Sequence, residues 1–417
     1  MARNRRNTRR IRSIRDVLNM RTFLTIVGIL MAIIIVCIGI NTYKRYEEKS
    51  NLAKQKEEIE KQSEAIFTSI NQTISKTNQN ISESDSYIKM SAVGDILCSE
   101  EMLEDAYNSH TKTYNFSHMF SKASGYITDA DIIMGTMETG IVDSRYNGER
   151  APVEFARAVK NSGINLVTIA HNHSLDLGVK GVAETKKNLE DIGFDVIGDN
   201  SKENALLIKE IKNTKIAFLT YTDLLDNKSS KAKEELESIN IYDENKVKQD
   251  IEKVKEEGAK YICVMMHWGN AITETVSDRQ KEIADFLVDQ GANLIIGAHP
   301  SVVQPMEIRQ NKDGKNVFIA YSIGTYISTL QAEEARTELV LNIELRRSGT
   351  DGNVYLNKIN YTPLYVLDNG YLAENRYQLI DLKSTIANYN SEDGTITEAT
   401  YDKLVRAMER LNKVLGQ

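Results

Sequence analysis

Residues 171–174 are His, Asn, His and Ser, and they directly follow the short apolar run 166–170. This run is rich in β-branched residues and has the length of a buried strand, and Gly178 opens the next helical pattern. Imidazole and amide groups at such a position can bind a metal ion, and an imidazole can also transfer a proton. Open α/β sheets present their functional groups where strands end. The sequence therefore predicts a functional site here, although a polar loop that caps a helix has the same pattern.

Four more predicted strands end in side chains of the same chemical kind. Asp95 and Glu138 follow two strands in the first part of the chain, and His267 and His299 follow two strands in its second part. Taken singly, Asp95 is explained as a turn residue, Glu138 as a helix cap and His299 as a loop corner. Carboxylate, amide and imidazole groups together are the ligands of a divalent transition metal such as Mn, Fe or Zn. Their joint occurrence predicts one shared metal site.

The histidines are concentrated at these strand ends, which hold four of the six in the chain. From the segment 171–174 we assign Asn172 and His173 to the site. His171 is left open between a ligand and a group that supports the ligands from behind. His110 and His118 lie away from the strand ends, and we expect them at the surface.

Predicted strands and helices alternate along residues 87–417, a pattern typical of an α/β sandwich with a mixed sheet. Apolar runs predict strands at 88–93, 131–135, 164–170, 194–197, 261–266, 293–296 and 317–321. Further strands, antiparallel or at sheet edges, are predicted at 205–211, 215–221, 338–344 and 355–365. Amphipathic patterns predict helices at 152–161, 179–192, 244–257, 278–290 and 398–415.

An uncharged apolar segment follows a strongly basic N-terminus. Residues 1–21 contain eight arginines and one aspartate, and residues 22–42 contain no charged residue. About 20 apolar residues cross a bilayer, and the positive-inside rule places the basic segment in the cytoplasm. A cleaved signal peptide is the alternative, but residues 41–44 offer no small-x-small cleavage site. We therefore expect a cytoplasmic segment 1–21, a single-pass signal anchor 22–42 in the cell membrane, and an extracytoplasmic body.

Residues 43–86 are expected to form a helical stalk and a linker before the folded domain 87–417. Leu52, Ile59 and Ile66 recur every seven residues, which favours a helix in a short coiled coil. The second heptad position is poorly apolar, so a solvated single helix fits equally well. Residues 77–86 are rich in Asn and Ser and read as the linker.

Charge argues against nucleic acid as a partner. The chain has a net charge of −7, and because residues 1–21 carry +7, the remainder carries −14. Binding of a phosphate backbone needs clustered Lys and Arg, which an acidic body lacks.

Five ordered motifs resemble those of CapA/PgsA-type capsule synthesis proteins, which are associated with making or exporting poly-γ-glutamate capsule. They are SAVGDIL at 91–97, AHNHSLDLG at 170–178, MHWG at 266–269, IIGAHP at 295–300 with Gln304, and YSIG at 321–324. The resemblance covers about residues 89–327. That family is similar to calcineurin-like metallophosphoesterases, so the resemblance implies a four-layer αββα sandwich with a two-metal centre.

Residue by residue, the resemblance also implies roles. Asp95 matches the aspartate of the first strand, and Glu138 matches the acid that bridges two metals. Asn172 matches the amide ligand, while His267 and His299 match the two histidines of the second metal. Two cations about 3.5–4 Å apart hold a bridging hydroxide and neutralise phosphoryl charge.

His173 matches the family histidine that protonates a leaving group, a general-acid role. The chain departs from the family pattern at residues 136–138, which are Thr-Met-Glu in place of Asn-Leu-Glu, and at Thr325 in place of Asn. Ser301 stands where the family usually has His, and a hydroxyl is a poor ligand beside imidazole. The resemblance therefore implies one well-bound divalent ion and a second site that is weak or empty, with Ser301 only supporting the ligands.

The leading expectation is a membrane-anchored, extracytoplasmic protein that serves poly-γ-glutamate capsule assembly or export. Its partners would be membrane synthase and transport subunits and the anionic polymer. An acidic body repels such a polymer unless a metal or a local basic groove compensates. The alternatives are a metal-dependent phosphoesterase that acts on a cell-envelope substrate, and a non-catalytic envelope scaffold.

Overall fold

The computed structural model describes residues 4–77, 81–127, 129–142, 150–200, 206–390 and 396–416. The chain separates into two compact units, Met1–Ile59 and Glu60–Gln417, and each is treated by itself. Helix α1 (Asn4–Thr77) supplies the first unit and continues into the second, which holds both sheets. The linker expected at 77–86 lies partly outside the described residues.

The first sheet contains the strands expected near the front of the chain together with three antiparallel strands from its end. Its spatial order is β18-β17-β16-β1-β4-β7-β8, with β15 paired to β1. The strands are β1 (Ser86–Ile96), β4 (Ile132–Met137), β7 (Leu166–Thr168), β8 (Asp195–Ile197), β15 (Thr325–Ile327), β16 (Thr337–Arg347), β17 (Val354–Asp368) and β18 (Tyr377–Asp381). The pairs β1–β4, β4–β7 and β7–β8 are parallel, so their carboxyl ends lie at one edge.

The second sheet has the order β13-β14-β12-β11-β10-β9. Its strands are β9 (Leu206–Ile211), β10 (Thr214–Thr222), β11 (Tyr261–His267), β12 (Leu294–Ala298), β13 (Met306–Gln310) and β14 (Asn316–Ala320). The four central strands, from β14 to β10, are parallel, and the outer strands β9 and β13 are antiparallel to their neighbours.

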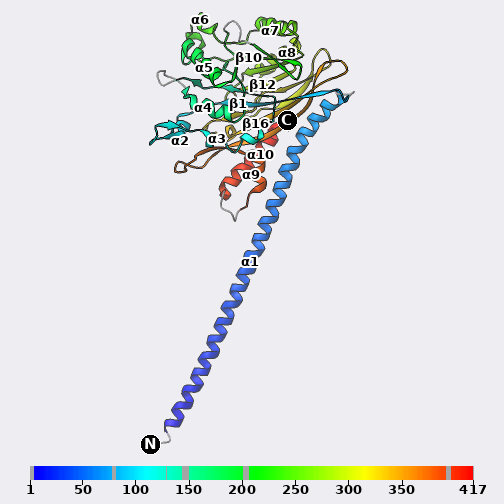
Figure 1. Cartoon of the computed structure of the whole chain (residues 1–417). Coiled ribbons are helices and arrows are strands. Elements are labelled where there is room, and N and C mark those ends of the chain that lie inside the picture. The colour runs from blue at the N-terminus through cyan, green and yellow to red at the C-terminus, as the bar shows by residue number, and fades with distance from the viewer. Residues whose placement is uncertain are drawn as a thin grey trace. The chain divides into compact units, whose positions relative to one another are not determined.

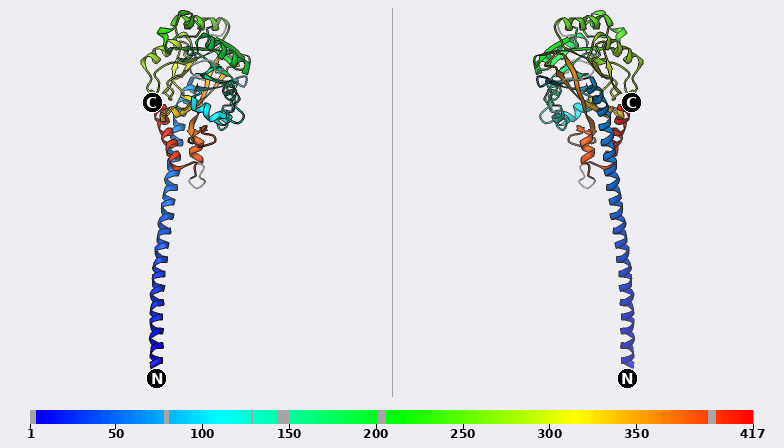
Figure 2. Two further views of the ribbon diagram at one scale, coloured as in Figure 1. Left: turned by 90° about the vertical axis from the view of Figure 1, so that its left-hand side faces the viewer. Right: turned by 90° about the vertical axis from the view of Figure 1, so that its right-hand side faces the viewer.

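The two sheets pack face to face, and helices cover their outer faces (Figures 1 and 2). Between the sheets, the hydroxyl oxygens of Thr168 and Thr220 are 2.8 Å apart, and Cys263 Sγ lies 3.8 Å from Met134 Sδ. Helices α4 (Val153–Asn161) and α5 (Gly178–Ile192) bury apolar residues against the first sheet, and α7 (Glu244–Glu256) and α8 (Asp278–Gln290) do so against the second. The predicted α/β sandwich of four layers is confirmed.

The covering helices have the signals that their sequences predict. In α8, Ser277 and Gln280 form a reciprocal capping box, and the helix ends at Gly291 with φ of 110°. Asp243 caps α7 by accepting a hydrogen bond from the backbone N–H of Lys246. These caps hold the helices in register over strands β11 and β12.

Shorter elements fill the remainder of the second unit. The helices are α2 (Glu100–Ala106), α3 (Ser117–Phe120), α6 (Lys233–Leu236), α9 (Leu382–Asn388) and α10 (Glu398–Leu415), with 3-10 turns at Ser124–Tyr126, Lys228–Ser230 and Glu333–Arg336. Two small strand pairs are β2 (Tyr107–Asn108) with β3 (Thr113–Tyr114), antiparallel, and β5 (Gly140–Ile141) with β6 (Arg150–Ala151), parallel.

Helix α1 is, among the described residues, the one helix that is long and apolar enough to cross a membrane. Its large apolar side chains from Phe23 to Ile40 are more than half exposed, except that of Val27, which is partly buried. Farther along the helix, within the second unit, Phe67 packs on Tyr361 with ring centroids 4.4 Å apart. The Asn71 side chain bonds both the N–H and the C=O of Ile359, at 2.9 and 2.7 Å. The last turns of α1 therefore pack on β17.

Candidate metal centre

Five of the predicted site residues meet where the parallel strands of the two sheets end. Asp95 is the next-to-last residue of β1, and Glu138 follows β4 directly. Asn172 lies in the turn after β7, His267 is the last residue of β11, and His299 follows β12 directly. The centre is thus built from both sheets.

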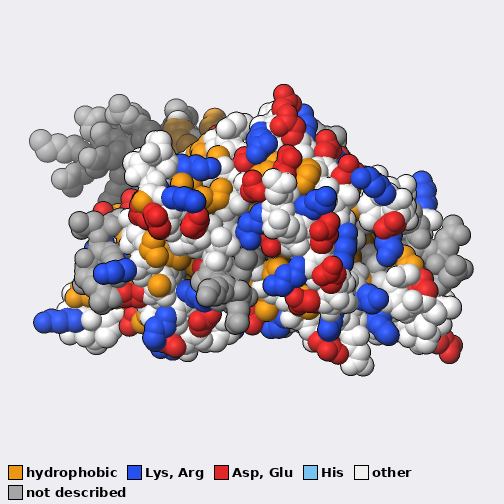
Figure 3. All heavy atoms as spheres, turned by 90° about the horizontal axis from the view of Figure 1, so that it is seen from above, with side chains coloured by type: hydrophobic (Ala, Val, Ile, Leu, Met, Phe, Trp, Pro, Cys, Tyr) orange, Lys and Arg blue, Asp and Glu red, His pale blue; other side chains and the backbone are white. Residues whose placement is uncertain are grey.

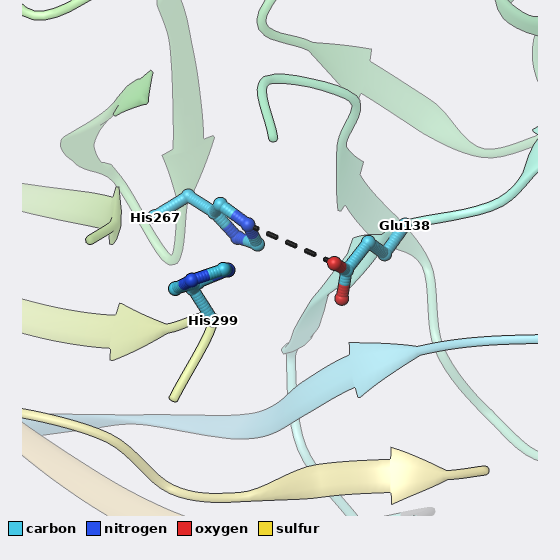
Figure 4. Close-up of side chains that lie close together, drawn as sticks. All are labelled: Glu138, His267 and His299. Carbon is cyan, nitrogen blue, oxygen red and sulfur yellow. Dashed lines mark ion pairs between the residues drawn. The ribbon is translucent and has the colours of Figure 1, made fainter. Parts of the chain in front are cut away.

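His267 lies in the middle of this group and is 2% exposed. Its Nε2 is 2.8 Å from Asn172 Oδ1 and 3.8 Å from Glu138 Oε1. Its Nδ1 is 3.5 Å from Asp95 Oδ1. Figure 4 shows the imidazole directed toward the Glu138 carboxylate, with His299 beside it. Both ring nitrogens of His267 therefore face oxygen atoms of the proposed ligands.

His299 is positioned through a hydrogen bond of its backbone N–H. Its N–H donates to Asp95 Oδ2 at 2.8 Å, and its ring centroid lies 4.8 Å from that of His267. His299 has φ of 91° and Ser301 has φ of 59°, conformations that are costly for residues other than glycine. Strained backbone of this kind persists where the surroundings impose it, often at functional sites.

The group has the composition and spacing of a site for one cation. Glu138, His267 and His299 each offer a ligand atom, and these atoms lie within 4.8 Å of one another. Among the described residues, Asp95 Oδ1, His267 Nδ1 and His299 Nδ1 are buried and have no hydrogen-bond partner. A buried polar atom without a hydrogen-bond partner costs free energy, and a divalent cation would supply a partner by accepting an electron pair from each of these atoms. The residues fit a metal.

Burial keeps the His299 imidazole neutral, which is the form that binds metal. Desolvation and, secondarily, the neighbouring His267 lower the pKa of His299 to about 4, although the Asp95 carboxylate acts in the opposite direction. At neutral pH this ring needs no deprotonation before it binds a cation.

His173 lies beside the centre, and its side chain is 26% exposed. Its Nδ1 is 2.8 Å from Asp176 Oδ2 and 3.5 Å from Asp226 Oδ2. A carboxylate at Nδ1 fixes the tautomer of an imidazole, so that Nε2 can handle a proton. Asp226 also accepts a hydrogen bond from Asn172 Nδ2 at 3.3 Å. The sequence did not indicate Asp226 as a site residue, because it lies in a loop without a motif.

Two residues expected to support the ligands lie close to them. His171 is 4% exposed, with its ring centroid 6.0 Å from that of His267, and burial lowers its pKa well below the usual value. Ser301 Oγ donates to the carbonyl oxygen of His299 at 3.2 Å. The prediction that His118 is a surface residue is wrong, because its side chain is 15% exposed and pairs with Asp105 at 2.8 Å.

One buried acid near the centre escaped the sequence analysis. Glu338, on β16, is 1% exposed, and a Cβ atom added at Gly94 would lie 3.3 Å from its Oε2. Burial raises the pKa of Glu338 well above its usual value, and the Asp95 charge raises it further, while the Gly94 amide lowers it. Burial therefore favours the protonated form of Glu338, which lies next to the strand that carries Asp95.

We predict that Glu338→Gln makes the chain more stable than the wild type, by an amount that grows from pH 5 to pH 7. The unfolded wild-type glutamate loses its proton above its ordinary pKa, whereas the raised pKa of the folded one moves this loss to higher pH. The free energy of unfolding of the wild type therefore falls by up to about 1.4 kcal/mol per pH unit in this window. Glutamine carries no titrating proton and removes this slope.

Chemical denaturation of the full chain in detergent at pH 5, 6 and 7 measures the difference between the two proteins. Glu344→Gln, on the same strand but partly exposed, is the control and is expected to show no pH-dependent difference. Equal pH slopes in wild type and Glu338→Gln would contradict the protonated state.

Comparison with known proteins places these residues within a family. Residues 89–330, more than half of the chain, match the model of the bacterial capsule synthesis protein PGA_cap. The capsule biosynthesis protein CapA of Bacillus anthracis is 27% identical over 278 residues, which cover 63% of this chain and 65% of that protein, just under two thirds of its length. The PGA biosynthesis protein CapA of Bacillus subtilis (strain 168) is 24% identical over 280 residues, 64% of this chain and 70% of that protein.

Solved structures with a similar arrangement are distant in sequence. The calcineurin-like phosphoesterase YfkN from Bacillus subtilis has 11% identity and a TM-score of 0.41, covering 79% of this chain and 98% of that chain. A 5'-nucleotidase precursor from Thermus thermophilus has 12% identity and the same TM-score, covering 80% of this chain and 60% of that chain. At these scores the likeness carries nothing about chemistry. The match over residues 89–330 shows that the chain belongs to the bacterial capsule synthesis protein family PGA_cap.

Proposed function

We propose that this chain is a membrane-anchored, extracytoplasmic protein that serves the assembly or export of poly-γ-glutamate capsule. The observation that carries the proposal is the group of Glu138, His267 and His299, the first two buried and the third partly buried, within a segment that matches the capsule synthesis family. The partners would be the membrane subunits that synthesise and transport the polymer, and the anionic polymer itself.

The membrane anchor is the apolar part of α1. Residues 22–42 carry no charge and follow eight arginines, and most of their side chains are exposed along the described helix. An exposed apolar helix of this length is stable in a bilayer, and the arginines favour the cytoplasmic side. The unit that contains the two sheets then lies outside the cell.

The metal centre would hold one divalent ion, Mn, Fe or Zn, through Glu138, Asn172, His267 and His299, with Asp95 at its edge. A bound divalent cation supplies Lewis acidity and lowers the pKa of a bound water. A second ion would have Asp95 and Glu138 as ligands but no imidazole from position 301, because residue 301 is a serine. The Ser301 hydroxyl donates its hydrogen bond to the His299 carbonyl oxygen. We therefore assign one strong site and one weak site.

The residues of the chain have separate tasks in this proposal. Asp95 holds the His299 backbone, and Asn172 links the ligand group to the Asp226 loop. His173, oriented by Asp176, can give a proton to or take one from a group bound at the centre. The same geometry would serve a phosphoesterase, in which His173 would transfer a proton. The experiment must therefore separate a capsule function that needs only the metal from one that also needs proton transfer by His173.

Complementation of a Bacillus subtilis strain that lacks its PGA biosynthesis protein CapA tests the proposal. The wild-type chain is expected to restore cell-associated polymer, measured as glutamate released from purified capsule. His267→Ala is expected to restore less than about a tenth of it, because it removes the central imidazole. His173→Ala, which leaves the ligand group intact, distinguishes proton transfer from metal-dependent assembly. A wild-type chain that is correctly inserted and yet restores no polymer would overturn the proposal.

A further inference from the structure

One cavity in the described part of the second unit lies away from the metal centre. It is a groove of about 810 Å³ between the last turns of α1, strand β17 and helix α9. None of its lining residues falls within residues 89–330, the segment that matches the family. The capsule family match therefore says nothing about this groove, and its chemistry has to be inferred from its own residues.

The groove has ordered walls. From Val354 to Pro363, β17 pairs with β16 on one side only, so its other side is a sheet edge within the described residues. Helix α1 lies along that edge, where the Asn71 side chain bonds both backbone groups of Ile359. Ser63 Oγ lies 2.7 Å from the Tyr361 hydroxyl in a buried contact. Such contacts hold the helix and the edge strand at a fixed separation.

The lining is basic, although the chain as a whole is acidic. Lys76, Lys358 and Lys383 face the groove, and Glu64 is the one carboxylate in its lining. Lys383 is also 3.7 Å from Glu60, outside the lining. On the face of the molecule in Figure 3, by contrast, lysine and arginine side chains are interspersed with aspartate and glutamate. An excess of lysines in a groove raises the local concentration of an anionic ligand.

The other polar groups of the lining match an amide-bearing chain. Gln72 and Asn360 present side-chain amides, which both donate and accept hydrogen bonds, whereas both ends of the Asn71 amide are already bonded to Ile359. The hydroxyl groups of Thr68 and Ser75 donate to carbonyl oxygens of α1, so they can only accept a hydrogen bond from a ligand. A polymer that alternates amide linkages with carboxylates would place its amide linkages against these polar side chains of the groove. Its carboxylates would lie against the lysines.

We propose that this groove binds the poly-γ-glutamate chain, at a site separate from the metal centre. The inference rests on the proposed function and specifies where the polymer is held. It also removes the difficulty that an acidic body repels an acidic polymer, because three lysines of the groove face the ligand locally.

Binding of fluorescently labelled poly-γ-glutamate to the full chain in detergent micelles tests the assignment. We expect the triple variant Lys76→Gln, Lys358→Gln and Lys383→Gln to bind roughly tenfold more weakly at low salt, since each exposed charge pair contributes modestly. Its affinity should also depend less on salt than that of the wild type, because fewer ion pairs remain to be screened. Replacement of the same three lysines by arginine keeps the charge and should keep binding.

A matched control removes three exposed lysines from the covering helices α7 and α8, Lys248, Lys253 and Lys281, and should leave binding unchanged. Gln72→Trp fills the groove without removing a lysine and should weaken binding as well. Thermal unfolding of every variant checks that the fold is kept.

The outcomes separate the two proposals. Absence of polymer binding by the wild type, together with failed complementation, overturns the proposed function. If the triple-glutamine variant and Gln72→Trp bind the polymer as tightly as the wild type does, the groove is not the polymer site, but the proposed function still stands. Equal competition by polyphosphate, which has no amide groups, overturns the assignment to a carboxylate-bearing polyamide. His110→Ala, which removes an exposed imidazole outside both the groove and the metal centre, should bind polymer as the wild type does.

Discussion

Replacing His267 with alanine is expected to weaken binding of a divalent transition metal by at least about 100-fold, since even partners behind the ligands contribute 10–100-fold. The reason is geometric: Nε2 of His267 lies 2.8 Å from Asn172 Oδ1 and 3.8 Å from Glu138 Oε1. Without this ring, the remaining atoms lose the imidazole that joins ligands from the two sheets. The measurement is the metal content of the purified full chain, followed by titration with Zn²⁺ and Mn²⁺ after chelation.

A matched control for this variant is His110→Ala, which removes an exposed imidazole far from the strand ends. Its metal content should equal that of the wild type. Because a ligand that binds only the folded state stabilises it, EDTA should lower the melting temperature of the wild type but not of His267→Ala. Unchanged metal affinity in His267→Ala would show that the group at the strand ends is not the metal site.

That the residues of this centre lie near one another could be predicted because each is at or near the end of an apolar run typical of a buried strand. The run before His267 lies in the fully buried strand β11 (Tyr261–His267), and the run before His299 lies in the fully buried strand β12 (Leu294–Ala298), which begins one residue later than predicted. Parallel strands then bring residues that are distant in sequence to one edge. What the sequence does not contain is the distance between the two sheets, and so the separation of Asp95 from His267 had to come from the structure.

Glu338 shows why part of the site was not predictable. In sequence, Glu338 and Glu344 are equivalent members of an alternating strand that is predicted at a sheet edge, a prediction that is wrong because β16 pairs with both β1 and β17. The structure buries Glu338 and leaves Glu344 partly exposed. The difference arises from close approach of β16 to Gly94 and Gly324, a contact between segments far apart in the chain. Local periodicity contains no information about such contacts.

The packing of the end of α1 is a second feature that the sequence alone could not predict. Heptad spacing of Leu52, Ile59 and Ile66 suggested either a coiled coil or a solvated helix. In the second unit, however, the buried positions include Ser63 and Phe67, which contact Tyr361, a residue 298 positions after Ser63. A buried serine interrupts an apolar seam, so the pattern of apolar residues alone could not identify this face. The groove follows from this packing and was likewise absent from the sequence analysis.

Gly94→Ala is expected to have the largest effect on stability. A Cβ atom at this position would lie 1.8 Å from the carbonyl oxygen of Gly324 and 2.7 Å from its carbonyl carbon. Both are backbone atoms, so neither can move aside as a flexible side chain would. Strand β1 would have to separate from the segment before β15, and a loss of more than about 4 kcal/mol in the free energy of unfolding is expected.

The same change should also impair metal binding, because Gly94 directly precedes Asp95. The Asp95 N–H bonds the Gly324 carbonyl at 3.4 Å, and Asp95 Oδ2 accepts from the His299 N–H at 2.8 Å. Displacement of Gly324 would therefore move the carboxylate that holds His299. Gly125→Ala, where an added Cβ meets no atom within 4 Å, is the control. Denaturant unfolding and metal titration of both variants decide the matter: a Gly94→Ala protein as stable as Gly125→Ala would mean that β1 does not approach Gly324 so closely, and that the position of Asp95 has to be reconsidered.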